Sequence, residues 1–313
     1  MTELVTFGET ALRLSPSDGE RFETTEDVRL RVSGTESNVA VAATSVGAEA
    51  TWLSKLPDTA LGHRVERALH QHGIETEIAW GEEGRQSLVF DERGSDPRDD
   101  RRYEDRSACA ASTVTPGELP MDRVQGADAT FVAGSTLALS GDIVQTAEAV
   151  MRAAGDNLVA MDVDYRPGLW SPDEARETLE RVFDAVDVLV ANEREAEVLF
   201  DRSGNPRQIA HAIASAHDFE TVVITRSGLG ALAWHDSVIH EQDGVETETV
   251  DESGQHAALV GGFLGRVLDG AGVDEALRYG VASATFCRTL PGAMTTATRT
   301  EIDDLVDELG TGR

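Results

Sequence analysis

Short apolar runs alternate with helical patterns along most of the chain, and this alternation predicts an α/β protein. Residues 3–8 and 51–56 have buried-strand patterns, and an amphipathic helix pattern over residues 58–72 ends at Gly73. From residue 127 onward the alternation is regular, with strand patterns in ATFVAG, LVAMDVD, VDVLVAN and TVVITR, each followed by a helix pattern or a turn. This order is typical of a doubly wound, mainly parallel sheet with helices on both faces.

Two stretches, at about residues 9–32 and 75–107, break this pattern. They carry short strands separated by charged turns and too few apolar residues for a central sheet. We expect them to form one small sheet that acts as a lid or a dimer face, because a one-sided sheet must cover something. A surface insertion without such a role is the alternative. No repeat or linker divides the chain, so we expect a single domain over residues 1–313.

A strand end, a glycine loop and a helix start follow one another in residues 250–263, VDESGQHAALVGGF. Such an arrangement leaves backbone N–H groups free to hold a phosphate. Other predicted strands also end in polar and glycine residues, and ligands of doubly wound sheets bind at those ends. The sequence therefore predicts a small polar ligand with phosphate or metal, near Gly8-Glu9, Gly134-Ser135, Asp162-Val163-Asp164, Asn192 with Glu195, and residues 225–230.

The formal net charge of −30 is spread along the whole chain, and Lys55 is its only lysine. A surface that attracts cations and a surface tuned to concentrated salt both fit this composition. The second is favoured, since at molar salt the Debye length is roughly 3 Å and dispersed charges repel one another little. We therefore expect a protein of an extreme halophile. The chain has no basic stripe for nucleic acid.

Three further features of the sequence suggest a cytoplasmic protein. There is no apolar run of about 18 residues that would span a membrane. The N-terminus has neither the basic nor the apolar region of a signal peptide. Cys109 and Cys287 have no metal-binding spacing and suggest no disulfide framework. We expect no membrane partner.

The order of motifs over essentially the full length resembles the ribokinase/PfkB-type carbohydrate kinases. The resemblance is carried by SGTESNVAVA with Gly34, Asn38 and Ala40, by Gly47, by residues 56–62, by NEREAE with Asn192 and Glu195, and by DESGQHAALVGGF. GET near the start, RSACAAS and DVDYRPGLW are most similar to 2-keto-3-deoxygluconate kinases. The resemblance implies a ribokinase-like fold with a β lid, often paired with a second subunit's lid in a homodimer. It also implies phosphoryl transfer from ATP to a sugar or sugar acid.

The family's Thr-Gly-Ala-Gly-Asp-Ala-Phe loop corresponds to residues 253–259 of this chain. Gly254 is kept, and Gln255 and His256 complete the anion-hole loop, with His256 where the family has a second glycine. Ala257 stands at the position of the family's catalytic base and cannot accept a proton. Loss of a positioned base typically costs about 10²–10⁴-fold in rate. His256 is the candidate substitute base, although neighbouring helical residues point about 100° apart.

On the sugar side, the resemblance implies a binding site with two altered lid positions. Val89 and Glu104 (or Asp105) replace lid tyrosines of the family, and acidic groups there would repel a sugar-acid carboxylate. Retained arginines could bind that carboxylate bidentately, or could form salt bridges in this acidic chain. An Asn at a helix start is also often a cap. The expected substrate-binding residues are Glu9, Gly34, Asn38, Val89, Glu104, Arg106 and Arg166.

On the nucleotide side, the resemblance implies ATP and Mg²⁺ as cofactors. Asn192 and Glu195 match a segment that arranges Mg²⁺ and its waters, the alternative being a helix cap with a solvated glutamate. The family's Lys-x-Gly-x-x-Gly turn corresponds to residues 225–230 with one glycine displaced. The expected nucleotide-binding residues are Asn192, Glu195, Thr225, Ser227, Gly228, Gly230 and Gly254.

Two functions therefore remain open. The motif order favours a sugar kinase, most like a 2-keto-3-deoxygluconate kinase, with full or weak activity. The residues at positions 89, 104, 256 and 257 favour a kinase-fold protein without phosphoryl transfer, which binds a sugar acid or nucleotide or supports a partner as a regulatory subunit. Relaxed chemistry explains the changes at the loop and the lid together, so we expect weak or absent activity.

Overall fold

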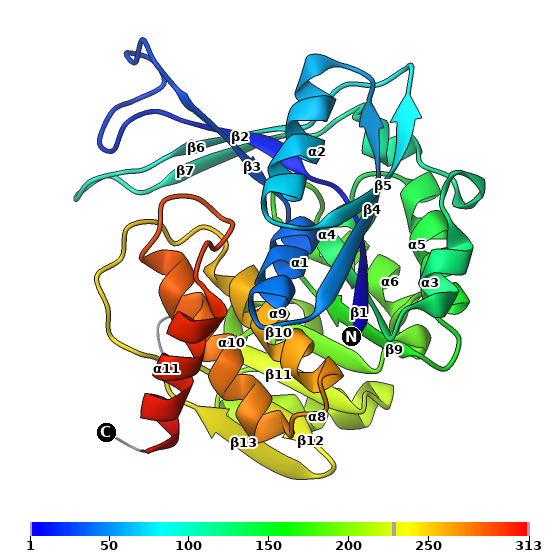
Figure 1. Cartoon of the computed structure of the whole chain (residues 1–313), viewed down its shortest axis with the longest axis vertical. Helices are drawn as coiled ribbons and strands as arrows, with labels where there is room; N and C mark the ends of the chain where they lie inside the picture. Colours follow the sequence, from blue (N-terminus) through cyan, green and yellow to red (C-terminus); the bar gives the residue numbers. More distant parts are fainter. Residues whose placement is uncertain (1, 227–229, 312–313) are drawn as a thin grey trace.

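In a computed structural model, described for residues 2–226 and 230–311, the chain folds around a large twisted sheet of nine strands (Figure 1). Seven neighbouring strands run parallel, while β12 and β13 form an antiparallel hairpin at one edge. The predicted doubly wound, mainly parallel sheet is confirmed. In spatial order the strands are β13 (Val238–Gln242), β12 (Gly230–His235), β11 (Thr221–Arg226), β10 (Val188–Asn192), β9 (Leu158–Asp162), β8 (Ala129–Ala133), β1 (Glu3–Phe7), β4 (Glu49–Pro57) and β5 (Glu75–Gly81).

Helices cover both faces of this sheet because its strands are apolar on both sides. In β8, Val132 packs into one hydrophobic cluster, while Phe131 and Ala133 pack into another, as the two-residue period of a strand requires. The first cluster is covered by α3 (Met121–Gly126), α5 (Gly141–Ala153), α6 (Pro172–Glu180), α7 (Glu193–Phe200) and α8 (Pro206–His217). The second is covered by α1 (Thr35–Ser45), α9 (Gln255–Leu268) and α10 (Val273–Arg288).

The remaining helices lie at the periphery of these two layers. α2 (Ala60–Gln71) packs on β4 and β5, and α11 (Arg299–Gly310) packs on α10. Short helical turns complete the fold at α4 (Gly134–Leu137), η1 (Ala110–Thr113), η2 (Pro116–Glu118) and η3 (Phe183–Ala185). Among the helices of the described residues, none combines the length and the apolar character that a membrane crossing would need.

Close contact between α1 and α9 fixes the start of α9 against the sheet. A Cβ atom on Gly261 would lie 2.3 Å from the backbone oxygen of Val39, and one on Gly265 would lie 2.6 Å from Val46. Glycine at these two positions therefore lets the backbone of α9 approach the backbone of Val39 and the side chain of Val46. The small residues of α1 contact α9 as well as the sheet.

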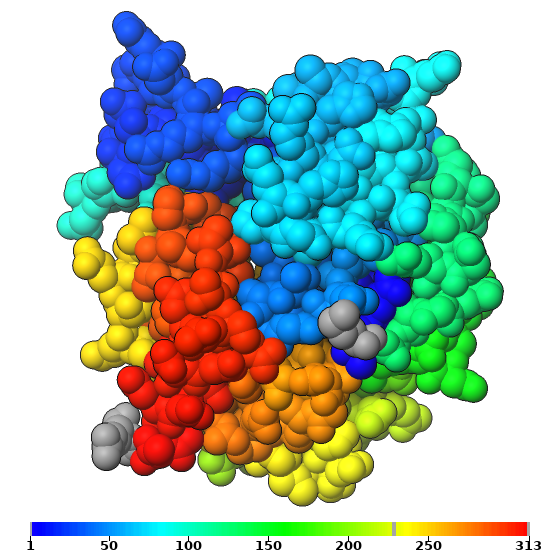
Figure 2. All heavy atoms as spheres, viewed as in Figure 1, coloured from blue at the N-terminus to red at the C-terminus, as the bar shows by residue number. Residues whose placement is uncertain are grey.

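A separate sheet of four strands forms the lid, in the order β3 (Arg29–Ser33), β2 (Ala11–Ser15), β6 (Leu88–Glu92), β7 (Arg101–Asp105). Figure 2 shows the lid's N-terminal part, in blue, on the same side of the molecule as the C-terminal segment in orange and red. The predicted small sheet is confirmed for these strands. The assignment of residues 75–81 to it is wrong, because β5 pairs in parallel with β4 in the large sheet. Helix α2 supplies the crossover that parallel neighbours need.

A buried arginine ties the lid to the loop before α9. Arg13 of β2 is 6% exposed, and its guanidinium lies 3.0 Å from Asp91 of β6 and 2.9 Å from Asp251. Asp251 also accepts hydrogen bonds from the backbone N–H groups of Ser253 and Gly292, each at 3.0 Å. Burial alone would raise the pKa of Asp251, but Ser253 and Arg13 hold it below its ordinary value. Asp251 is thus a charged turn residue that anchors the lid.

Glu36 joins α1 to the end of β8. Its side chain is buried, and Oε1 accepts a hydrogen bond from the backbone N–H of Ala133 at 3.1 Å. Burial raises the pKa of Glu36 to about 8, although a hydrogen bond with Thr136 opposes this rise. Glu36 is therefore mostly protonated at neutral pH.

Replacing Arg13 should destabilise the protein more than replacing an exposed arginine. Arg13→Met removes the buried guanidinium between Asp91 and Asp251 and leaves them only the more exposed Arg102 and Arg93 as partners, and we expect a loss of about 3 kcal/mol in the free energy of unfolding. Arg207→Met is the matched control, because Arg207 pairs with Glu241 at 2.7 Å on the surface and should contribute about 0–1 kcal/mol. Equal effects in denaturant titrations would contradict the anchoring role of Arg13.

The buried Glu36 carboxyl should make stability depend on pH. Since its folded-state pKa is raised from 4.5 to about 8, its protonated form stabilises the fold below pH 4.5, and this contribution is lost as the pH rises through about 8. Glu36→Gln removes this titration. The free energy of unfolding of the variant, relative to that of the wild type, should therefore rise by roughly 1 kcal/mol per pH unit between pH 4.5 and about 8. Unfolding free energies across the window test this, with the exposed Glu177→Gln as the control for charge removal. A constant difference between Glu36→Gln and the wild type would contradict it.

Candidate active site

The N-terminus of α9 has the geometry of an anion-binding loop. Gly254 is the N-cap residue and has a φ of +84°, a left-handed conformation that favours glycine. A Cβ atom there would also lie 2.0 Å from the backbone oxygen of Ala293. No side chain caps the helix. The N–H of Gln255 donates to the backbone oxygen of Glu252 at 3.4 Å, which leaves the next N–H groups, those of His256 and Ala257, available to an anion.

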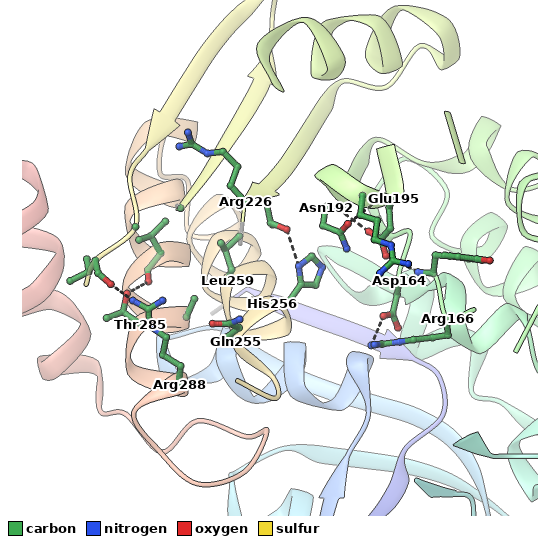
Figure 3. Close-up of a pocket in the computed structure, with 18 residues that line it drawn as sticks. Asp164, Arg166, Asn192, Glu195, Arg226, Gln255, His256, Leu259, Thr285 and Arg288 are labelled. Carbon is green, nitrogen blue, oxygen red and sulfur yellow. Dashed lines mark hydrogen bonds and ion pairs between the residues drawn. The ribbon is translucent and has the colours of Figure 1, made fainter. Parts of the chain in front are cut away.

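A cavity of about 340 Å³ opens beside this loop, between the ends of β10 and β11 and the helices α9 and α10. Figure 3 shows His256 extending from the start of α9, with Arg226 and Arg288 on one side of the cavity and Arg166 on the other. The lining brings together many of the predicted residues, namely Arg166, Asn192, Glu195, Thr225, Gly230, Gln255 and His256. Ser227 and Gly228 lie outside the described residues.

The imidazole of His256 is held between two strand ends. Its Nε2 lies 2.7 Å from Oδ2 of Asp162, and its Nδ1 lies 3.1 Å from Oγ1 of Thr225. Burial alone would lower the pKa of His256, but the charge and hydrogen bond of Asp162, together with Glu195, raise it to about 9. At neutral pH the ring is therefore an imidazolium. In that state it has no lone pair with which to take a proton from a sugar hydroxyl.

Ala257 lies in the hydrophobic core at the next position of α9. It is 4% exposed and belongs to the apolar cluster with Val260 and Phe263. The first turn of α9 has no acidic residue. The position where the resemblance expects a proton acceptor thus holds a methyl group.

Three buried carboxyl groups lie around His256, and each is engaged by the protein itself. Besides pairing with His256, Asp162 accepts a bond from the backbone N–H of Asp164 at 3.3 Å. Asp164 pairs with Arg166 at 2.6 Å and accepts a hydrogen bond from Thr35 at 2.7 Å. The positions of Asp162 and Asp164 at the end of β9 were a signal in the sequence, because polar residues there follow a buried strand.

The third carboxyl group, that of Glu195, belongs to a helix cap. Its two oxygens accept hydrogen bonds from the backbone N–H groups of Tyr165 at 2.7 Å and Asn192 at 2.8 Å, while Asn192 caps the N–H of Glu195. These contacts form the capping box of α7. Glu195 is 5% exposed, so it is a buried residue rather than a solvated one. Burial, with Asp162 nearby, raises its pKa to about 7.

On the sugar side, Arg106 pairs with two carboxylates. It lies 3.2 Å from Glu9 and 2.8 Å from Glu104, and all three side chains are buried. Although burial alone would lower the pKa of Arg106, these carboxylates raise it. Val89 lies directly opposite Glu104 across β6 and β7, so the lid places its two altered positions together.

Asn38 and Glu9 have buried oxygen atoms that face no protein donor. Asn38 Oδ1 and Glu9 Oε1 lack a hydrogen-bond partner within the part of the chain that the structure describes. The N-cap of α1 is Gly34, not Asn38, and a Cβ atom on Gly34 would lie 2.5 Å from the backbone oxygen of Glu9. Buried acceptors of this kind are expected where a ligand donates hydrogen bonds.

Three cavity arginines, Arg194, Arg226 and Arg288, were not among the predicted site residues. Arg194 and Arg226 lie inside the matched segments, so their positive charge was a signal that could have been used. Arg288 ends α10 and donates a hydrogen bond to the backbone oxygen of Val245. No local pattern links Arg288 to the strand ends, because only the packing of α10 brings it there.

Comparisons of sequence agree with this geometry. The family described as pfkB family carbohydrate kinase matches residues 1–300. The chain is 44% identical to the 2-dehydro-3-deoxygalactonokinase of Haloferax volcanii over 303 residues, which cover 96% of this chain and 95% of that protein. It is 25% identical to the 5-dehydro-2-deoxygluconokinase of Bacillus subtilis, over 97% of this chain and 96% of that protein.

Solved structures of carbohydrate kinases have the same fold as this chain. The 2-dehydro-3-deoxygluconokinase of Thermotoga maritima superposes with a TM-score of 0.92 at 26% identity, covering 98% of this chain and all of that one. A putative ribokinase II of E. coli, solved with ATP and Mg²⁺, has a TM-score of 0.89 at 17% identity, with 98% of this chain and 100% of that one covered. The predicted ribokinase-like fold is confirmed. The chain belongs to the pfkB family of carbohydrate kinases.

Proposed function

We propose that this protein binds a nucleotide and a 2-keto-3-deoxy sugar acid, and that it transfers the phosphoryl group weakly or not at all. The start of α9 carries the proposal. Ala257 offers no proton acceptor, and the His256 imidazolium is committed to Asp162 at 2.7 Å. Asp251, the buried carboxylate of the loop before α9, is held by Arg13 and by two backbone N–H groups. No described group in the first turn of α9 can therefore act as the base.

Ligand binding is supported separately on each side of the site. The names of the Haloferax volcanii and Thermotoga maritima relatives point to 2-keto-3-deoxy sugar acids. Asn38 and Glu9 present buried acceptors for hydroxyl groups, and Arg166 retains an N–H group beyond its pair with Asp164. The cationic cavity beside Gly254 supports nucleotide binding.

A slow sugar kinase is the second candidate. Gly254 and the uncapped start of α9 are retained, so donors to a transferring phosphoryl group are still in place. Stabilisation of the transition state without a base would leave a low residual rate.

We also propose that the protein works in concentrated salt and forms a homodimer through the lid. The net charge of −30 supports the first of these. The edge strand β7 supports the second, since it presents unpaired backbone groups beside the 54% exposed Tyr103.

A coupled assay should show little turnover. With ATP, Mg²⁺ and either 2-keto-3-deoxygalactonate or 2-keto-3-deoxygluconate in molar KCl, we expect a rate about 10²–10⁴-fold below that of the Haloferax volcanii relative assayed in parallel. A thermal shift with each ligand shows whether the protein still binds them. A rate within tenfold of the relative would refute the proposal.

Restoring the family's residues should raise the rate. Ala257→Asp combined with His256→Gly restores the family's base and second loop glycine, and in the presence of Mg²⁺ we expect a gain of about 10²-fold or more. Gln255→Asp combined with His256→Gly is the matched control, because it adds the same carboxylate about 100° away on the helix. A folded Ala257→Asp/His256→Gly variant that binds both ligands but gains no activity would show that the α9 start is not the limiting feature.

A further inference from the structure

The nucleotide cavity is positively charged in a protein whose net charge is −30. Its lining contains two acidic residues, Asp164 and Glu195. The same lining contains five cationic side chains, those of Arg166, Arg194, Arg226, Arg288 and His256. This local excess is what a polyphosphate would require.

The carboxyl groups around the cavity do not suit a magnesium ion. Mg²⁺ is bound through carboxylate and water oxygens in near-octahedral geometry. Here both oxygens of Asp162, Asp164 and Glu195 already accept from protein donors. Over residues 2–226 and 230–311, no group of three His, Cys, Asp or Glu residues is arranged to hold a metal. Asn192 and Glu195, which the resemblance linked to Mg²⁺, are occupied by the cap of α7.

His256 places a positive charge where the phosphates would lie. It is the second residue of α9, two positions beyond Gly254, so it belongs to the helix turn whose N–H groups no side chain caps. Asp162 and Thr225 fix the ring from the opposite side at 2.7 Å and 3.1 Å. A divalent cation beside this imidazolium would be repelled.

We propose that this protein binds the phosphates of a nucleotide without Mg²⁺, and that the imidazolium of His256 takes over the charge neutralisation. The inference rests on the proposed nucleotide binding. It goes further, because it assigns a role to the residue that replaces the family's second loop glycine. The cavity arginines then contact the remaining phosphate oxygens, as guanidinium groups do in other proteins.

Calorimetric titration of the wild-type protein with ATP tests the inference, in molar KCl with either Mg²⁺ or EDTA. We expect binding in EDTA, with a Kd within about threefold of the value in Mg²⁺. If ATP binds in Mg²⁺ but not in EDTA, the inference is overturned while the proposed nucleotide binding stands. If ATP binds in neither, both are overturned.

Variants at the ion pair then test His256 itself. Asp162→Asn combined with His256→Gly removes the imidazolium without leaving a buried unpaired carboxylate. In EDTA we expect this variant to bind ATP about 10- to 100-fold more weakly, because a positive charge beside the phosphates is lost. His256→Lys keeps a cation and should retain binding in EDTA. Unchanged affinity in the double variant would overturn the role of His256.

A second histidine in the chain provides a matched control. His235 on β12 also lies between a threonine and an aspartate, 2.8 Å from Thr221 and 3.5 Å from Asp236. It does not line the nucleotide cavity. His235→Gln should therefore leave ATP affinity in EDTA unchanged. If His235→Gln weakened ATP binding as much as the double variant does, the effect would come from general destabilisation, and the proposal would be overturned.

Discussion

A buried ion pair joins His256 at the start of α9 to Asp162 at the end of β9, and the chemistry of the site depends on it. Neither group would be stable alone at that depth, since an unpaired buried charge costs several kcal/mol. Together they place an imidazolium at the mouth of a helix whose first N–H groups are uncapped. The pair thus turns its cationic member toward a helix start that can hold an anion, and it withholds a proton acceptor from the same place.

The lid and the core are connected through the residues that lead into this loop. Asp251 forms an ion pair with Arg13 of the lid. It also accepts hydrogen bonds from the backbone N–H groups of Ser253 and Gly292. Gly254 then turns the chain in a left-handed conformation directly against Ala293. The start of α9 is therefore set by contacts from both sheets and from the segment after α10. A change in how the lid docks would therefore alter the start of α9, because Asp251 contacts both.

Two parts of the candidate site differ in electrostatic character. Arg106, a predicted sugar-binding residue, is neutralised by Glu9 and Glu104, whereas the cavity beside α9 keeps an excess of arginines. The fold is therefore that of the pfkB family, while many charged groups of the candidate site are paired with each other.

The sequence by itself determined the layered α/β architecture, the separate lid strands and the segment that starts α9, because apolar periodicity and glycine turns are local signals. It also placed Asn192, Glu195, Thr225 and His256 near one ligand. It assigned β5 to the lid wrongly, since an edge strand covered on one face has few apolar residues whichever sheet it joins. Only the tertiary structure decided that His256 pairs with Asp162 and that Arg288 reaches the cavity. Those contacts join residues far apart in the chain, and no spacing or periodicity records which distant charges folding will bring together.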